Sequence, residues 1–232
     1  MSSTNGRANM RRVVSGALVA CLGFAALAVA ADMVYPAADE PNHKALLDND
    51  KVHVYQVKLK PGEATYFHTH TRDQVGVVMG TAKITNQVMG GPETVVAVER
   101  GSMAYIPYTV LGPSTHRVRA SQGDPFWNIG VDFLTPSPDP KAQRLSAKPD
   151  EQKLALPQGT MERVTIEPKG RWAVSGSLII AMSPGTLGTA SNSKAWTFAE
   201  GDIKWIEGAA ESAYVNTSIG AVSLVVLKLN KS

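Results

Sequence analysis

Two histidines separated by a single residue, His68 and His70, are the clearest candidates for chemistry in the 232-residue chain. The surrounding segment, ATYFHTH, is rich in aromatic and β-branched residues and predicts a β-strand. Because successive side chains of a strand point to opposite faces, the two imidazoles would lie close together on one face. Neutral imidazole nitrogens placed side by side in this way are suited to binding a metal ion.

A glutamine and a third histidine extend this pattern. Gln74 follows His70 in the sequence and directly precedes the apolar run 75–79. His116 occurs much later, at the start of the segment HRVR, which also predicts a strand. Both residues therefore lie on or next to segments that predict strands, as His68 and His70 do.

The remaining histidines, His43 and His53, each stand alone in the sequence, and we expect both to be structural residues outside the site. For the other three, the alternative to a metal site is a polar cluster that fills the interior without an ion. Three imidazoles packed together with neither a metal nor an acid would leave ring nitrogens without partners, which favours the metal site.

Glycines and a proline recur at fixed distances from these residues. They form two motifs, Gly62-x5-His68-x-His70-x3-Gln74-x5-Gly80 and Gly101-x5-Pro107-x4-Gly112-x3-His116. The first resembles the first cupin motif, G-x5-H-x-H-x3,4-E-x6-G, and the second resembles the second cupin motif, G-x5-P-x-G-x2-H-x3-N. The second motif is longer here than in the family, and its terminal Asn falls on Ala120.

The resemblance implies that His68, His70 and His116 hold one divalent metal ion, Fe, Mn or Zn, per chain. Gln74 stands where the family has Glu, unless Asp73 takes that place with shifted spacing. Gln74 would either ligate the metal or hydrogen-bond a metal-bound water or substrate. Three protein ligands leave further coordination positions open for substrate.

This ligand set resembles that of the Fe(II)-dependent cupin dioxygenases that act on diketones, thiols or aromatic diols. We therefore predict a metal-dependent, dioxygenase-like oxidoreductase acting on a small, chelating, anionic substrate. Gln74 and Tyr66, which shares the predicted strand face of His68, are the candidate catalytic residues. The alternatives are a non-catalytic protein of the cell envelope that binds a metal or small ligand and, beyond that, a cupin isomerase or lyase.

The elements that must position these residues are short strands. Apolar or alternating segments are separated by Gly and Pro turns and occur at 52–59, 75–79, 94–98, 127–133, 162–166, 177–182, 194–198, 203–206 and 222–229. Such short, regularly spaced strands predict an all-β sandwich or barrel. The resemblance implies two cupin-type barrels of the double-stranded β-helix, or jelly-roll, kind.

The second half of the chain resembles a shortened copy of the first. Gly101-Ser-Met-Ala-Tyr-Ile106 is echoed by Gly201-Asp-Ile-Lys-Trp-Ile206, which predicts an internal duplication. The second half contains no histidine, so we expect a degenerate barrel without metal ligands. The alternative is a ligand pocket of its own, lined by Trp172, Trp205 and Tyr214.

These observations divide the chain into four segments. We expect a signal peptide at residues 1–30 and an N-terminal cupin barrel with the metal site at residues 31–134. A proline-rich linker or strap follows at residues 135–152, and a degenerate C-terminal barrel at residues 153–232.

The first segment predicts export. Arg11-Arg12 precedes an uncharged apolar run, 13–30, that ends in Ala-Val-Ala, as in a cleaved signal peptide. An uncleaved anchor is the alternative, and a lipoprotein site at Cys21 is disfavoured because the apolar run continues beyond it. We therefore expect a periplasmic or secreted protein with no membrane span after cleavage.

The charge balance of the chain limits the classes of partner that it is expected to bind. The chain has 23 basic and 20 acidic residues, but three of the basic ones lie in the first thirty positions, so the remainder is neutral, with 20 of each. A neutral chain offers no charge-based reason to bind nucleic acid. We expect a small-molecule ligand or substrate as the partner, with a homodimer as an open alternative. The single Cys excludes a disulfide framework within one chain.

Overall fold

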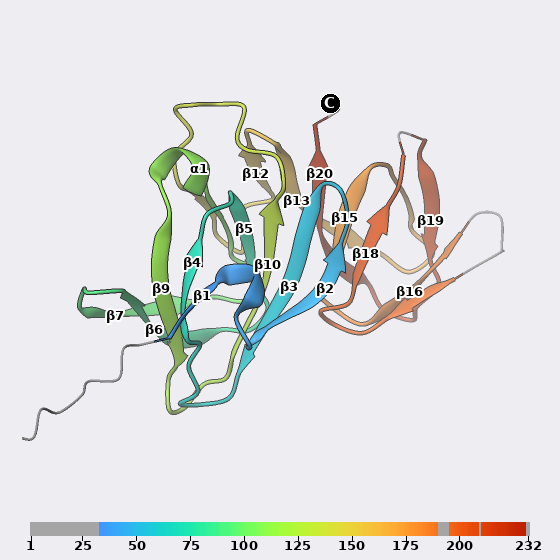
Figure 1. Ribbon diagram of the computed structural model, residues 1–232. Helices are drawn as coiled ribbons and strands as arrows, with labels where there is room; N and C mark the ends of the chain where they lie inside the picture. Colours follow the sequence, from blue (N-terminus) through green and yellow to red (C-terminus); the bar gives the residue numbers. More distant parts are fainter. Residues whose placement is uncertain (1–32, 190–194, 209, 231–232) are drawn as a thin grey trace, which may run out of the picture. The chain divides into compact units, whose positions relative to one another are not determined.

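The computed structural model describes residues 33–189, 195–208 and 210–230 (Figure 1). The predicted signal peptide, residues 1–30, lies outside the described residues. The described residues belong to one compact unit. None of the helices in the described part of the chain is long and apolar enough to cross a membrane.

The predicted all-β class is confirmed. The first half contains the strands β1 (Val34–Pro36), β2 (His43–Asp48), β3 (Val52–Leu59), β4 (Phe67–His70), β5 (Gln74–Val78), β6 (Ala82–Val88), β7 (Glu93–Val98), β8 (Met103–Ile106), β9 (Ser114–Ala120) and β10 (Phe126–Phe133). Its helices are the short 3-10 turn η1 (Ala37–Asp39) and the single turn α1 (Tyr108–Leu111).

The strap and the second half also consist of short strands. They are β11 (Leu145–Ala147), β12 (Lys153–Leu156), β13 (Gly159–Ile166), β14 (Arg171–Val174), β15 (Ser177–Ala181), β16 (Gly185–Thr189), β17 (Trp196–Phe198), β18 (Ile203–Ile206), β19 (Ser212–Asn216) and β20 (Val222–Leu229).

These strands form four sheets, which we number 1 to 4. Sheet 1 has the order β1-β4-β9-β6-β7, sheet 2 β11-β8-β5-β10-β3-β2, sheet 3 β12-β13-β20-β15-β18 and sheet 4 β14-β19-β16-β17. The order β8-β5-β10-β3-β2 of sheet 2 recurs in sheet 3 as β18-β15-β20-β13-β12. The order β4-β9-β6-β7 of sheet 1 recurs in sheet 4 as β14-β19-β16-β17. The second half therefore repeats the strand order of the first, as an internal duplication requires.

The largest hydrophobic core lies between sheets 2 and 3. Strand β5 shows how the sequence divides its side chains: Val75 and Val77 are fully buried in this core, and the intervening Gly76 faces the other way, into a cavity. The alternation follows from the two-residue period of a strand. Burial of one valine side chain stabilises the fold by about 1.5–3 kcal/mol. This core therefore packs against one face of sheet 2, and the cavity of the candidate site lies on the opposite face.

The proline-rich segment, residues 135–152, is held against both halves. Its strand β11 pairs with β8 and extends sheet 2 by one strand. The Ser137 backbone N–H donates to Asp73, and the Arg163 guanidinium donates to the backbone carbonyls of Lys148 and Pro149. The segment therefore crosses the surface as an ordered strap.

The sheets keep free edges within the described residues. In sheet 1 the outermost strands are β1 and β7, and in sheet 2 they are β2 and β11. The strands of neither half close into a barrel in the described part of the chain, so the two-barrel arrangement stays a prediction.

Candidate metal centre

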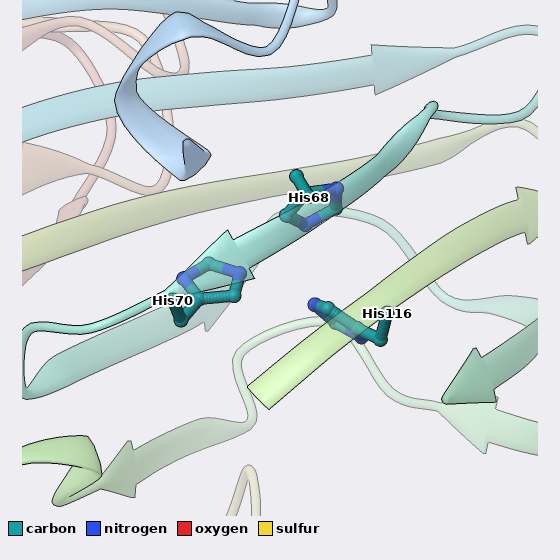
Figure 2. Close-up of side chains that lie close together, drawn as sticks. All are labelled: His68, His70 and His116. Carbon is teal, nitrogen blue, oxygen red and sulfur yellow. The ribbon is translucent and has the colours of Figure 1, made fainter. Parts of the chain in front are cut away.

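The three predicted histidines come together on one face of sheet 1. His68 and His70 lie two residues apart on β4 and so point to the same face, and His116 on β9 lies directly opposite His68 in the antiparallel pair. Figure 2 shows the rings turned toward a common space from these two strands. One nitrogen from each ring can be chosen so that all three lie within 4.8 Å of one another. This spacing is compatible with a single bound ion, since Zn–N bonds of about 2.0–2.1 Å would place two ligand nitrogens 3–4 Å apart.

Hydrogen bonds fix the orientation of two of these rings. Nδ1 of His68 lies 2.9 Å from the backbone oxygen of Tyr66, and Nδ1 of His116 lies 2.7 Å from Oδ1 of Asn86. Because these oxygens only accept, each Nδ1 carries the hydrogen and each neutral ring keeps a lone pair on Nε2. Such support of a histidine through its second nitrogen is common at metal sites.

Two ring nitrogens in this cluster are buried without a partner. They are Nδ1 of His70 and Nε2 of His116, neither of which has a hydrogen-bond partner among the described residues. Leaving buried polar atoms unpaired costs about 1–3 kcal/mol each. The donor set therefore fits a divalent cation, which would use the free lone pairs.

Burial keeps these imidazoles neutral. Desolvation, followed by the neighbouring His116 and His68, lowers the pKa of His70 to about 2. Desolvation and then His68 lower the pKa of His116 to about 3. Desolvation also lowers the pKa of His68, against the opposing effect of its bond to Tyr66. At neutral pH these rings are therefore not protonated, and their lone pairs are available to a metal.

Gln74 lies in the wall of the same cavity, with its amide group tied to sheet 2. Its Nε2 donates to the Tyr55 hydroxyl and, at 3.3 Å, to Oδ1 of Asp132. Desolvation raises the pKa of Asp132 to about 6. The structure thus places Gln74 beside the histidines as a wall residue whose donor atoms are already used.

Asp73, the alternative to Gln74 as the acidic ligand, is engaged elsewhere. Its side chain is completely buried and accepts hydrogen bonds from Thr109, Ser137 and Gln158 at 2.7–2.8 Å. It does not belong to the histidine cluster. Its carboxylate joins the α1 turn, the strap and the second half, so the alternative in which Asp73 takes the place of the family's Glu is corrected.

Tyr66 also lies away from the cavity, contrary to the expectation that it shares the face of His68. Its side chain is 49% exposed and packs against Tyr35, with 5.3 Å between ring centroids. The reason is that β4 begins at Phe67, so the two-residue alternation does not extend back to Tyr66. Tyr66 contributes its backbone instead, which accepts from His68 and donates to Glu40.

His43, expected to be a structural residue outside the site, is a fourth histidine in the cavity wall. It lies on β2, and its ring meets the His68 ring edge-on, with 4.6 Å between centroids. Its Nδ1 lies 2.7 Å from the Ala37 backbone oxygen. Desolvation and then His68 lower its pKa to about 3. His53, by contrast, pairs with Asp48 and does not line the cavity.

A tyrosine that the sequence analysis did not single out holds His43 in place. The ring of Tyr55 on β3 stacks on His43, with 4.5 Å between centroids and 12° between ring planes. Gly130, directly opposite Tyr55 on β10, makes room for this ring, because a Cβ there would come within 2.5 Å of it. The glycine therefore has a packing role that is visible only once the strands are paired.

A second tyrosine covers His70. Tyr108 stacks on His70 with 5.1 Å between ring centroids and 10° between planes. It begins α1, the turn formed by the residues that lengthen the second motif between Pro107 and Gly112. Desolvation raises the pKa of Tyr108 to about 12, so the phenol stays neutral. The departure from the family's spacing thus supplies a turn whose tyrosine packs on His70.

The cavity itself has a volume of about 200 Å³. Its lining combines the four histidines with Tyr55, Gln74 and Asn128 and with apolar side chains that include Val57, Ile106, Val118 and Phe126. No carboxylate lines it among the described residues. An acidic group lies behind this lining: Oε2 of the buried Glu40 lies 3.8 Å from Nε2 of His43.

The second half shows no comparable site. It contains no histidine, and the cluster of metal-ligand residues found in the described part of the chain is the one in the first half. Trp172 and Tyr214 pack against the core between sheets 3 and 4, whereas Trp205 packs against the core between sheets 2 and 3. The three aromatic residues therefore lie in two different cores, and the alternative of a pocket lined by all three is corrected.

No family model matches the sequence, and no curated protein matches it either. The structure is similar to AerE from Microcystis aeruginosa, with a TM-score of 0.59 and 10% identity, over 84% of this chain and 100% of that one. It is similar to YlbA from E. coli, with a TM-score of 0.59 and 14% identity, over 83% and 85% of the two chains. It is also similar to a salicylate 1,2-dioxygenase from Pseudaminobacter salicylatoxidans, with a TM-score of 0.53 and 13% identity, over 81% and 76%. The latter two are cupin-domain proteins, and this likeness, with the motifs around three converging histidines, shows that the chain has the cupin fold.

Proposed function

We propose that this chain binds one divalent metal ion through His68, His70 and His116 and catalyses the oxidation of a small, chelating, anionic substrate. The observation that carries the proposal is the set of buried ring nitrogens with free lone pairs. Buried imidazoles that stay neutral and keep unpaired nitrogens are suited to holding a metal ion.

The charge of the site supports an anionic substrate. Three neutral ligands and a lining without a carboxylate would supply no negative charge in direct contact with a bound cation. An enolate, catecholate or similar bidentate anion would supply the missing negative charge. When bound, a metal such as iron supplies open coordination positions for substrate and O2.

The chain's own residues would orient the reactants. Asn86 and the Tyr66 backbone hold two of the rings, while Gln74 and His43 face the space beside the cluster. The apolar side chains of the wall would limit contact with water, which would strengthen electrostatic interactions inside the cavity. The structural similarity to a protein named as a salicylate 1,2-dioxygenase, whose named substrate is an aromatic anion, is compatible with this chemistry.

The organisation of the chain around this site is part of the proposal. Residues 1–30 direct export to the periplasm or the exterior, 31–134 and 153–232 form two cupin-type barrels, and 135–152 forms the strap between them. The repeated strand order supports the two barrels, and the basic and apolar pattern of the first thirty residues supports export.

Oxygen consumption by iron-loaded protein tests the activity. With β-diketones, thiols and catechols as a panel, we expect wild-type protein to consume O2 with at least one member and His70→Ala to consume none. His53→Ala is the matched control, because His53 lies outside the cavity. Gln74→Glu should keep the metal and lower the rate, since an added carboxylate reduces the effective charge of the metal. Native protein that carries zinc and never consumes O2 when iron-loaded would instead indicate a non-catalytic binding protein.

A further inference from the structure

A second and larger cavity adjoins the histidine cavity. It has a volume of about 670 Å³ and is lined by residues 97–99, 102–104 and 146–150 together with the inner faces of β5 and β10. We call it the outer cavity. Five residues line both cavities: Gly76, Val78, Val98, Ala104 and Asn128. The two cavities therefore adjoin one another along these residues.

The outer cavity lies where the sheets of the first half fail to meet. One side comes from the end of β7, the edge strand of sheet 1, and the other from β11, the edge strand of sheet 2. The strap, by adding β11 to β8, builds this second side. The outer cavity thus depends on a segment that lies outside both cupin motifs.

One face of the outer cavity is formed by residues with small side chains. Gly76, Ala104 and Ser146 lie directly opposite one another on β5, β8 and β11. Residues paired in this way point to the same face of a sheet, and here that face lines the outer cavity. Ala104 and Ser146 are both exposed, so no side chain fills the space above them.

The sizes of the two compartments indicate what they hold. Binding sites for small molecules usually have volumes of about 300–1,000 Å³, so the histidine cavity alone is small for one and the two together fall within the range. His70, only 4% exposed, keeps an unpaired nitrogen at the inner end, where a chelating group would bind next to the metal. The outer end is wider, and most of its lining is apolar, although Glu99, Lys148 and Asp150 also contribute to it.

We propose that the outer cavity binds the body of the substrate while its chelating head lies in the histidine cavity. The substrate class is therefore a chelating anion that carries an extended apolar substituent, and Ala104 and Ser146 determine how large that substituent can be. This inference rests on the proposed function, because the head is held by the metal.

A series of 4-alkylcatechols binding to the metal-loaded protein tests the inference by titration calorimetry. Burial of one methylene group contributes about 0.8 kcal/mol, or about fourfold in affinity. From 4-methylcatechol to 4-butylcatechol, we expect the affinity of wild-type protein to rise about 60-fold. Ala104→Trp and Ser146→Trp should each remove most of this rise and leave the metal content unchanged.

Ala173→Trp is the matched control, because Ala173 is an exposed alanine on β14, in the second half. It should keep the full dependence on chain length. Equal affinity for the short and long catechols in wild-type protein would overturn the inference while leaving the metal site standing. An undiminished rise in both Ala104→Trp and Ser146→Trp would also overturn it. Failure of every catechol to bind the metal-loaded protein would overturn the inference alone, whereas failure of the protein to bind metal would contradict the proposed function as well.

Discussion

Mild acid is expected to destabilise the metal-free protein, because its stability depends on keeping several imidazoles neutral. His43, His70 and His116 have folded pKa values of about 3, 2 and 3, below the ordinary value of 6.5. The unfolded chain therefore binds protons more tightly than the folded chain. The free energy of unfolding is unaffected above about pH 6.5 and falls as the pH drops below that value.

The size of the effect follows from these shifts. At pH 5, each of the three imidazoles lowers the free energy of unfolding by about 2 kcal/mol, or about 6 kcal/mol together. Asp132 acts in the opposite direction, because its raised pKa of about 6 means that the folded state takes up its proton first. Its contribution between pH 7 and pH 5 is about 1 kcal/mol, which leaves a net loss of about 5 kcal/mol.

Urea unfolding of the metal-free protein at pH 7, 6 and 5 measures this loss. A loss of about 5 kcal/mol is comparable to the whole stability of many domains, so the urea midpoint should fall steeply. A variant that replaces His70 and His116 with leucine should lose much less between pH 7 and pH 5. A midpoint that stays constant over this range in the wild-type protein would refute the reasoning from buried neutral imidazoles.

Three further variants test single contacts. Asn86→Leu should lower metal affinity about 10–100-fold, because His116 loses the acceptor that fixes its hydrogen on Nδ1; metal titration measures this, and an unchanged affinity would contradict it. Asp73→Ala should lower the free energy of unfolding by about 3 kcal/mol or more, since several buried donors lose their acceptor; urea unfolding of the metal-loaded protein is the measurement, and a loss below 1 kcal/mol would argue against it. Tyr66→Phe should leave both metal content and oxygen consumption unchanged, as the phenol lies outside the cavity, and a loss of either would restore it as a site residue.

Much of the site could be predicted from local sequence pattern. The spacing of His68 and His70 needs only the two-residue period of a strand, and both lie on β4 as expected. His116 was found through the glycines and proline of the second motif, and pairing of β4 with β9 places it opposite His68. These features are local or follow a fixed spacing, which is why sequence alone reaches them.

The missed residues depend on strand pairing that no spacing reveals. His43 reaches the cavity from β2, on the opposite sheet, and stands outside both motifs. Tyr55 faces the cavity because Gly130 lies opposite it, a relation fixed only by the register of β3 and β10. Tyr66 was misplaced because the start of β4 could not be located to the residue.

The most direct test of the metal centre is an anomalous-scattering crystal structure of the protein with its native metal. We expect one peak per chain in the first half, about 2.0–2.2 Å from one nitrogen each of His68, His70 and His116. A metal-replete crystal with no peak among these three rings, or with its peak on other residues, would contradict the account.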